Sequence, residues 1–372
     1  MTQQPPPNWQ QYLATLLTAY ITAEESLLGG VAGILRLTSP DRLSQLLALG
    51  RMRALSNGVV QQLFDADRLI GPLVSKAITA GTRSGMVEVR RAGVPPRRPF
   101  STDLALIPEP FDFGMPHGIR SERAIRADLV SSLDDVKRRI TRLPDDVYKL
   151  ISPASAAGQV LGRGYTPAQA QAYAWQAYVK RGVAGFTDRS GRDWSLSAYV
   201  EMSVRTATLR AFNDAHLQVI TATGSNLVIV SDDGHPCPLC FPWQNVVLAV
   251  VPDGKHPSIA DAIAAGLMHP NCKHVWTIYI PGITVLPAPR EWSDDDARLY
   301  KLTQQQRRLE REVRNAKKQL EYATDPATAA DSRAAVRKAQ ANMRQFIDQT
   351  GFIRQSRREQ VDLANDRLKL PA

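Results

Sequence analysis

The stretch LYKLTQQQRRLEREVRNAKKQL, residues 299–320, decides the fold class of this chain. Its apolar residues alternate at spacings of three and four, which is the period of a helix with one apolar face. The series is Leu299, Leu302, Gln306, Leu309, Val313, Ala316 and Leu320, in which Gln306 is the one polar member. Arg, Lys and Glu occupy most of the positions between them. The pattern predicts a helix with a coiled-coil-like seam about three heptads long.

A second helix is expected directly after the first. Asp325-Pro326 is a start signal, because Asp caps a helix and Pro fits its first turn. An apolar stripe of Val336, Ala339, Met343 and Phe346 follows, and Gly351 is suited to end the helix. We therefore expect a helical hairpin over residues 291–352 and a polar tail over 353–372.

Helical patterning also fills the first half of the chain. Residues 1–92 form an expected N-terminal helical region, with helices over 8–28, 40–56 and 58–79. Residues 93–118 carry six prolines and are predicted to form a Pro/Arg-rich linker or arm. A central helical domain is expected over 119–225, with helices over 119–151, 167–181 and from Ser195 to a stop at Gly224.

A small β-containing module is predicted over residues 226–284. Leu227–Val230 is a short run rich in β-branched residues, and residues 246–251 and 274–280 are further strand candidates, with a short helix over 258–265. The fold class is therefore α+β and mainly α-helical.

The composition limits the function classes. The 372 residues are 44% apolar and 22% charged, as in soluble folded proteins. The net charge is +10, and 35 of the 46 basic residues are Arg, which favours polyanionic partners. No uncharged apolar stretch reaches the roughly 18 residues of a membrane-spanning helix, so integral membrane association is not expected. The N-terminus lacks a basic signal-peptide region, so synthesis in a cytoplasm is expected.

Cysteine and histidine gather in one window. All three Cys and four of the six His lie between residues 235 and 274. Cys237-x2-Cys240 and His269-x2-Cys272 are two close pairs of soft ligands, each on a tight turn. Such pairs assemble tetrahedral zinc sites, so we expect a structural zinc ion on Cys237, Cys240, His269 and Cys272.

Other interpretations of this window stay open. His235 or His274 could replace His269, because each lies two residues from a cysteine. The cysteines could instead be small buried core residues, or Cys237 and Cys240 a redox pair.

An enzyme built on Cys237, Cys240, His269 and Cys272, zinc- or thiol-dependent and deaminase- or hydrolase-like, is the alternative function. Pro236-Cys237-x2-Cys240 matches the Pro-Cys-x2-Cys half of the zinc deaminase signature. The other half is His-x-Glu, and in His216-x-Gln218 a glutamine takes the place of the required glutamate. Glu201, Asp232 and Asp233 are the nearby candidates for a general base. We expect that this chain is not an enzyme and that it has no small-molecule substrate.

Three basic groupings are candidates for nucleic-acid contact. The first holds Arg90, Arg91, Arg97 and Arg98. The second is Lys137 to Arg139 with Arg142, from which Arg138 and Arg139 are the candidates, and the third is the expected helix from Arg307 to Lys318. Phosphate contacts by such residues give salt-dependent binding without sequence preference. A charged helix face exposed to solvent is the alternative interpretation.

Several motifs in fixed order resemble the phage minor capsid protein 2 family, which is related to the MuF-like head morphogenesis proteins of tailed phages. The motifs cover about residues 195–360 and are Ala198–Thr206, Asn226–Ser231, Cys237-x2-Cys240, Met268–His274, Tyr279–Gly282, Gln304–Arg314 and Met343–Arg354.

The resemblance implies a virion structural component that acts in head assembly. The implied place is the capsid interior near the portal, after assembly in the host cytoplasm. Its implied partners are the portal protein, other head proteins and packaged double-stranded DNA. The resemblance carries no catalytic residue onto this chain.

Overall fold

The computed structural model describes residues 7–94, 122–152, 164–181, 186–187, 193–194, 196–232, 237–288 and 290–361. The helices of this part of the chain are α1 (Pro7–Arg36), α2 (Arg42–Asp67), α3 (Ile70–Arg91), α4 (Glu122–Ile151), α6 (Pro167–Arg181), α7 (Leu196–Ala222), α8 (Ile259–Ala264), α9 (Asp294–Glu321) and α10 (Pro326–Thr350), with 3-10 turns η2 (Phe241–Trp243) and η3 (Ser356–Glu359). The strands are β1 (Phe186–Thr187), β2 (Asp193–Trp194), β3 (Leu227–Val230), β4 (Val247–Ala249) and β5 (Trp276–Ile278).

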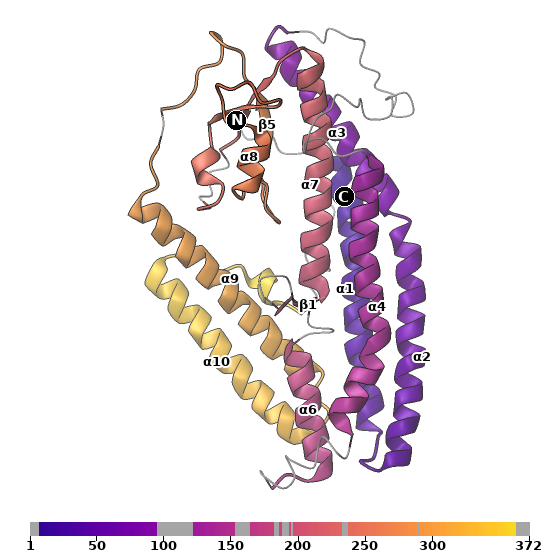
Figure 1. Cartoon of the computed structure of the whole chain (residues 1–372). Coiled ribbons are helices and arrows are strands. Elements are labelled where there is room, and N and C mark those ends of the chain that lie inside the picture. Colours follow the sequence, from indigo (N-terminus) through magenta and orange to yellow (C-terminus); the bar gives the residue numbers. More distant parts are fainter. Residues whose placement is uncertain are drawn as a thin grey trace. The chain divides into compact units, whose positions relative to one another are not determined.

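Helices dominate these residues, and the few strands are short (Figure 1). The expected class, α+β and mainly helical, is confirmed. The expected helix over 167–181 and the strand over 227–230 have the bounds of α6 and β3. The hairpin is confirmed as α9 and α10.

One expected helix break is wrong. The sequence predicts a boundary between residues 56 and 58, but Gly58 lies inside α2, and α3 starts only at Ile70. Met52, Ser56, Val59 and Leu63 continue one buried stripe through this point. Because that stripe is unbroken, burial keeps the helix intact and outweighs the low helix propensity of one glycine.

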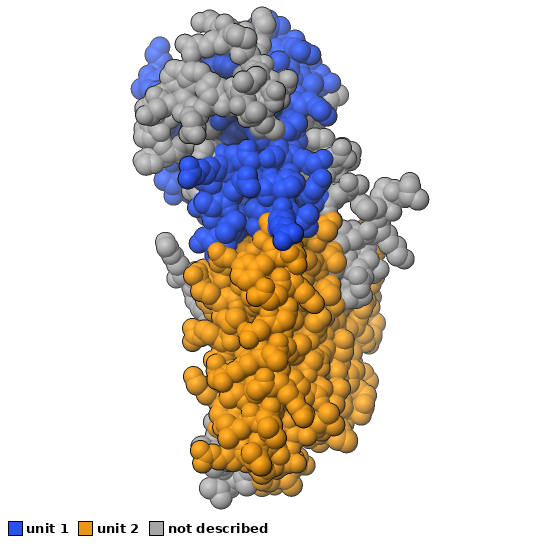
Figure 2. Space-filling model, turned by 90° about the vertical axis from the view of Figure 1, so that its right-hand side faces the viewer, with its two compact units in different colours: residues 1–13, 68–131, 202–302 blue, residues 14–67, 132–201, 303–372 orange. Residues whose placement is uncertain are grey.

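The chain forms two compact units, each assembled from three separate stretches of sequence (Figure 2). Unit 1 comprises residues 1–13, 68–131 and 202–302, and unit 2 comprises residues 14–67, 132–201 and 303–372.

In unit 1, α3 and α7 approach each other through glycines. A Cβ atom on Gly81 would lie 2.1 Å from the carbonyl oxygen of Phe212, and one on Gly85 would lie 2.8 Å from Cβ of Val219. The missing side chains therefore permit backbone contact between the two helices.

An antiparallel sheet with the strand order β4-β3-β5 completes unit 1. Val228 pairs with Leu248 on one side and with Ile278 on the other. One apolar core joins this sheet to α3, α7 and α8, and it includes Val89, Leu217, Val230, Cys240, Ile259, Leu267, Cys272 and Trp276. Two cysteines of the predicted metal site therefore belong to the core of the module.

In unit 2, a buried polar contact joins α1, α2 and α4. Tyr20 donates a hydrogen bond to Asp67, and Lys137 forms ion pairs with Asp67 and Asp134. Lys137 is buried, so it is unavailable to the basic grouping that the sequence placed at residues 137–139.

The α9–α10 hairpin contacts α1 and α6 within unit 2. Lys318 and Glu24 form a buried ion pair with 3.1 Å between Nζ and Oε2. Trp175 donates from Nε1 to the carbonyl oxygen of Tyr322 at 2.8 Å. Asp325 caps α10 by accepting from the Thr328 amide, and Gly351 ends it with φ of 70°. Both termini of α10 are therefore confirmed as expected.

None of the described helices is long and apolar enough to cross a membrane.

Candidate metal centre

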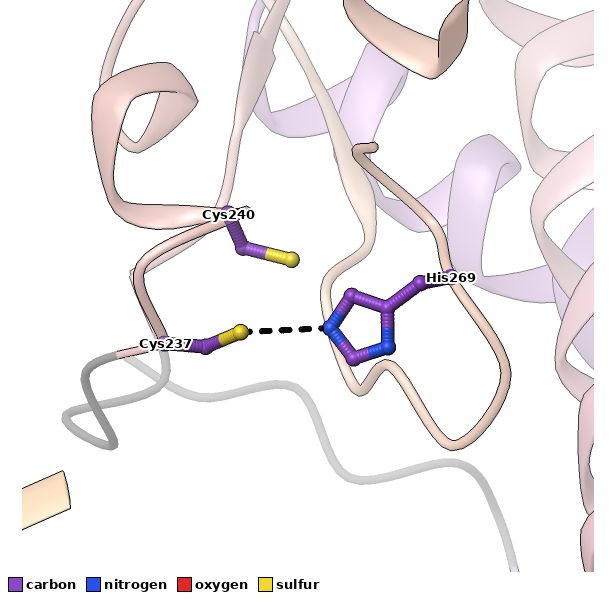
Figure 3. Close-up of side chains that lie close together, drawn as sticks. All are labelled: Cys237, Cys240 and His269. Atoms are coloured by element: carbon purple, nitrogen blue, oxygen red, sulfur yellow. Dashed lines mark hydrogen bonds between the residues drawn. The ribbon is translucent and has the colours of Figure 1, made fainter. Parts of the chain in front are cut away.

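The first ligand pair lies on the turn that leads into η2. The carbonyl oxygen of Cys237 accepts from the amides of Cys240 and Phe241, at 3.0 and 2.8 Å. These bonds close the chain into a turn, which directs the side chains of Cys237 and Cys240 to the same side (Figure 3).

The second pair lies on the loop between α8 and β5. The Cys272 amide donates to the carbonyl oxygen of His269 at 2.9 Å, which closes a second tight turn. Met268 and Asn271 adopt left-handed backbone conformations, with φ of 57° and 66°. Asn tolerates this region better than most residues, so Pro270-Asn271 shapes the turn as expected.

The two turns bring five potential ligands together in two triads that share Cys240. Cys237, Cys240 and His269 form one triad, and Cys240, Cys272 and His274 form the other. Within each triad all potential ligand atoms lie within 4.8 Å of one another. All four residues predicted from the sequence therefore belong to this cluster, and His274 joins them.

Two separations between ligand atoms match edges of the tetrahedron around a zinc ion, although Cys272 does not lie within 4.8 Å of all three ligand atoms of the first triad. With Zn–S near 2.3 Å and Zn–N near 2.0 Å, the edges of the tetrahedron are about 3.8 Å for S–S and about 3.5 Å for S–N. The Sγ atoms of Cys240 and Cys272 lie 3.7 Å apart, and Sγ of Cys237 lies 3.3 Å from Nε2 of His269 (Figure 3).

Burial differs across the cluster. Cys240, Cys272 and His274 are buried, whereas Cys237 and His269 are half-buried. Polar groups enclosed in an apolar core need partners, and here the ligand groups are one another's partners.

His274 is held in place by residues that the sequence did not indicate. Its ring Nε2 lies 2.9 Å from Nε2 of Gln244, and its Nδ1 lies 3.2 Å from Sγ of Cys272. The side-chain amide of Asn213 donates to its carbonyl oxygen at 3.0 Å. Gln244 and Asn213 are neither Cys nor His, so no spacing signal could have identified them.

The thiols divide into proton donors and acceptors. The Cys240 thiol hydrogen-bonds to its neighbours, which lowers the pKa of Cys237 to about 3 and that of Cys272 to about 4. The pKa of Cys240 itself is raised, chiefly because its thiol donates a hydrogen bond to Cys237, which favours the protonated form of Cys240. The hydrogen bond with Cys237 raises the pKa of His269 to about 9. A metal requires thiolate ligands, so Cys237 and Cys272 are already in the form that it needs, whereas Cys240 would lose its proton on metal binding.

The structure also bears on the other interpretations of residues 235–274, in which the cysteines are core residues or a redox pair, or another histidine is the ligand. Cys240 and Cys272 do belong to the apolar core, and all three cysteines are free. His235 lies outside the described residues. The cluster geometry is therefore compatible with both a metal site and a thiol pair.

A cavity of about 130 Å³ adjoins the cluster. It lies against α7 and α8, and His269 and Cys272 form part of its wall with Asn213, Asp214, Ile259 and Trp276. Asp214 is a polar group beside this wall that sequence reasoning missed. The cavity is the feature on which a catalytic interpretation depends.

Neither of the described general-base candidates, Glu201 and Asp232, lines the cavity beside the cluster. His216, which belongs to the incomplete deaminase signature, is buried on α7, where its Nε2 lies 2.5 Å from Oε2 of Glu88. Asp232 follows β3, Asp233 lies outside the described residues, and Glu201 belongs to unit 2, whereas the cluster belongs to unit 1.

Only some of the arginines predicted to contact nucleic acid are exposed in the described part of the chain. Arg90 and Arg91 are exposed in the last turn of α3 in unit 1, and Arg97 and Arg98 lie outside the described residues. In unit 2, Arg138 is exposed and forms an ion pair with Asp135, and Arg139 is half-buried.

Comparison with known proteins identifies a relative from a phage. A curated relative, named "Structural protein", from Lactococcus phage LL-H is 29% identical over 189 residues, which cover 47% of this chain and 51% of the relative. The chain thus spans about half the length of that relative. No solved structure matches the chain. The family model described as phage minor capsid protein 2 matches residues 124–348. This match covers more than half of the sequence and confirms the resemblance, so the chain belongs to the phage minor capsid protein 2 family.

Proposed function

We propose that this chain is a non-enzymatic component of the phage head, acting in head assembly from a position inside the capsid near the portal and the packaged DNA. In this proposal a zinc ion fixes the module of residues 226–284 as a rigid scaffold. The family membership supports a structural role. The convergence of Cys237, Cys240 and His269 within 4.8 Å carries the metal part of the proposal.

Zinc is the metal that this ligand chemistry favours. Thiolates and imidazoles bind zinc in preference to magnesium or calcium, which take oxygen ligands. Cys237, Cys240 and His269 would hold the ion with Cys272 as the fourth ligand, because Cys272 lies within tetrahedral-edge distance of Cys240. His274 would donate a hydrogen bond to Cys272 and so hold that thiolate in orientation.

A structural role follows from the position of the ligands in the fold. The two turns belong to segments separated by the whole of β4 and α8, and these segments meet at the core of unit 1. The three strands are only three or four residues long, so a bond through a metal would add to the stability of the module.

A zinc- or thiol-dependent hydrolase is the second candidate, favoured by the cavity at His269 and Cys272. A catalytic zinc ion keeps one position open for water, and Asp214 is an acidic group in the cavity wall that could serve as a general base.

Metal analysis of the purified full-length chain tests the metal proposal. We expect one equivalent of zinc in the wild type, none in Cys240→Ser, and a loss of protease resistance on chelation. Ser75→Ala, which removes a side-chain hydroxyl on α3, is the control and should keep the metal. Zinc-free, protease-resistant wild-type protein with reactive thiols would refute the metal proposal.

Coordination spectroscopy separates the two candidate functions. X-ray absorption at the zinc edge should give three sulfur ligands and one nitrogen ligand, which fill the site. A water ligand together with turnover of an ester or amide substrate would instead support the hydrolase.

Placement beside DNA is tested by salt-dependent binding. Replacement of Arg90 and Arg91 with Gln should weaken binding to duplex DNA and reduce the slope of log K against log salt by about one for each phosphate that the variant no longer neutralises. Arg138→Gln and Arg139→Gln test the second grouping in the same assay. Co-purification with portal rings from a phage lysate tests the portal contact, and a virion that lacks the chain but contains DNA and portal would contradict an assembly role.

A further inference from the structure

The segment that follows α10 folds back along α9. Residues 352–361, which we call the strap, include η3 and belong, with residues 303–321 of α9, to unit 2. Three side chains of α9 donate hydrogen bonds to the strap at 2.8 to 2.9 Å: Gln306 to the carbonyl oxygen of Ile353, Arg314 to that of Arg358, and Lys317 to Oε1 of Gln360. At 1.5 Å per residue, these contacts follow one side of α9 for about 16 Å.

Two buried carboxylates hold arginines of the strap in place. Glu359, in the strap, is 1% exposed and accepts two hydrogen bonds from Arg354, at 2.7 and 2.6 Å. Glu310, on α9, is 4% exposed, and its Oε2 lies 3.8 Å from Nη1 of Arg358. Because both carboxylates are withdrawn from solvent, they fix these cations without placing negative charge on the surface.

Basic side chains gather on this side of α9 and in the strap. Arg307 lies only about 20° around α9 from Arg314, and it is close enough to Glu310 to stabilise the charge of that carboxylate. Arg307 and Arg357 are exposed and form no ion pair with any described residue. We call the following set the strap face: Arg307, Arg314, Lys317, Arg354, Arg357 and Arg358.

Few exposed carboxylates lie beside these cations. Within residues 303–321 of α9, Glu312 lies on the side of the helix opposite the strap, and Glu321 lies one turn beyond Lys317. On α10, Asp348 lies opposite the buried stripe that includes Met343. Glu321 is therefore the one exposed carboxylate that residues 303–321 contribute to this side, against the six cations of the strap face.

The chemistry of the strap face fits the phosphate groups of a nucleic acid. Five of its six side chains are Arg, whose guanidinium can donate two parallel hydrogen bonds to one phosphate. Each strand of a duplex presents a phosphate about every 3.4 Å along the axis, so a surface about 16 Å long can meet several in a row. An acidic protein fits less well, because protein interfaces have an apolar centre and Ile353 is the only large apolar side chain exposed in the strap.

We propose that the strap face binds the phosphate backbone of the packaged duplex. The inference rests on the proposed placement beside DNA and names a surface for it. The candidate grouping of residues 307–318 is divided by the structure, because Arg308 lies on the side of α9 opposite the strap and Lys318 is buried. The strap adds three arginines from a segment that the sequence predicted only as a polar tail.

Fluorescence anisotropy of a labelled duplex, titrated with the full-length chain at several salt concentrations, tests the proposal. Arg307→Gln should reduce the slope of log K against log salt by about one, and Arg307→Gln combined with Arg357→Gln by about two, with binding about tenfold weaker or more at low salt. Arg308→Gln is the matched control, because it removes the same charge from the adjacent exposed position on the other side of α9. It should leave the slope unchanged.

The alternatives give different results. Equal effects of Arg307→Gln and Arg308→Gln would overturn the proposal, since binding would then follow net charge alone. A loss of binding confined to the variant of Arg90 and Arg91 would overturn it and leave the placement beside DNA intact, whereas a wild type without affinity for duplex DNA would overturn both. Polyglutamate that competes better than unlabelled duplex would identify an acidic protein as the partner and also overturn it. Thermal unfolding midpoints of the variants should match that of the wild type, because Arg307 and Arg357 are exposed.

Discussion

Glu88 on α3 and His216 on α7 meet with 2.5 Å between Oε2 and Nε2, inside the core of unit 1. The second oxygen of Glu88 accepts from the backbone amide of Ile278 on β5 at 2.9 Å. One carboxylate thus joins two helices to the edge of the sheet that carries the metal-binding turns. A buried acceptor with two donors is costly to remove, because both donors lose their partner.

Removal of this carboxylate should destabilise unit 1. Glu88→Ala is expected to lower the free energy of unfolding by about 2–5 kcal/mol, since His216 and the Ile278 amide would both be left without this acceptor. Glu88→Gln keeps one acceptor for the amide and should lose less. Urea denaturation gives the values, and equal effects of the two substitutions would contradict the two-donor account.

Side-chain addition at the α3–α7 contact should be destabilising. In Gly81→Ala the new Cβ would lie 2.1 Å from the Phe212 carbonyl oxygen, so the helices must separate, at a cost of about 1–3 kcal/mol or more. Gly58→Ala is the matched control, because Gly58 lies within α2 with open space in front of it. It should stabilise the chain by about 0.5–1 kcal/mol. Thermal unfolding midpoints that shift in the same direction for both variants would refute this contact.

The two histidines of the cluster should differ in their effect on metal affinity. His269→Ala removes a proposed ligand and should abolish tight binding. His274→Ala removes only the group that hydrogen-bonds to Cys272 and should weaken binding about 10–100-fold. Competition with a chromogenic chelator measures both affinities, and the reverse order would make His274 the ligand.

The cap of α10 offers a local test in unit 2. Asp325 accepts from the amide and the hydroxyl of Thr328, which is buried. Asp325→Ala should cost about 0.5–2 kcal/mol, whereas Asp325→Asn should retain most of the stability. Chemical denaturation of the three proteins distinguishes these values, and a neutral Asp325→Ala would show that the cap contributes nothing.

One contact in unit 2 should make stability sensitive to alkaline pH. Tyr173 donates to Asp331 at 2.8 Å, and this hydrogen bond raises the pKa of the phenol to about 12. The pKa in the unfolded chain is about 10, so the folded state holds this proton more tightly. The contribution is therefore complete below a pH of about 10 and is lost as the pH rises toward about 12. The stability difference between wild type and Tyr173→Phe should shrink over that interval, and a constant difference would count against the contact.

Local signals in the sequence located much of the fold. Asp325 and Gly351 mark the ends of α10 because capping depends only on neighbouring residues. Cys237, Cys240, His269 and Cys272 were found because each pair lies on one turn. The helix boundary predicted at Gly58 is wrong because it rests on the low helix propensity of glycine alone. The buried stripe on either side of Gly58 keeps α2 continuous.

Contacts between distant segments left no such signal. Glu88 and His216 are 128 residues apart, and nothing in the composition around either residue indicates the other. Gln244 and Asn213 reach His274 only because the sheet and α7 meet there. Likewise, periodicity predicts which residues of α2 share a face, but only the packing of α1 and α4 determines which face is covered.

The buried pair of Glu24 and Lys318 bears on how this chain can be divided for expression. Glu24 belongs to α1 near the start of the sequence, and its counter-ion arrives from α9 almost three hundred residues later. A fragment that stops before α9 would enclose a carboxylate without its ammonium group, and it would also strip Trp175 of its carbonyl acceptor. Cloning boundaries drawn between α8 and α9 would therefore yield an N-terminal piece prone to aggregation, although the connecting segment looks like a natural place to cut.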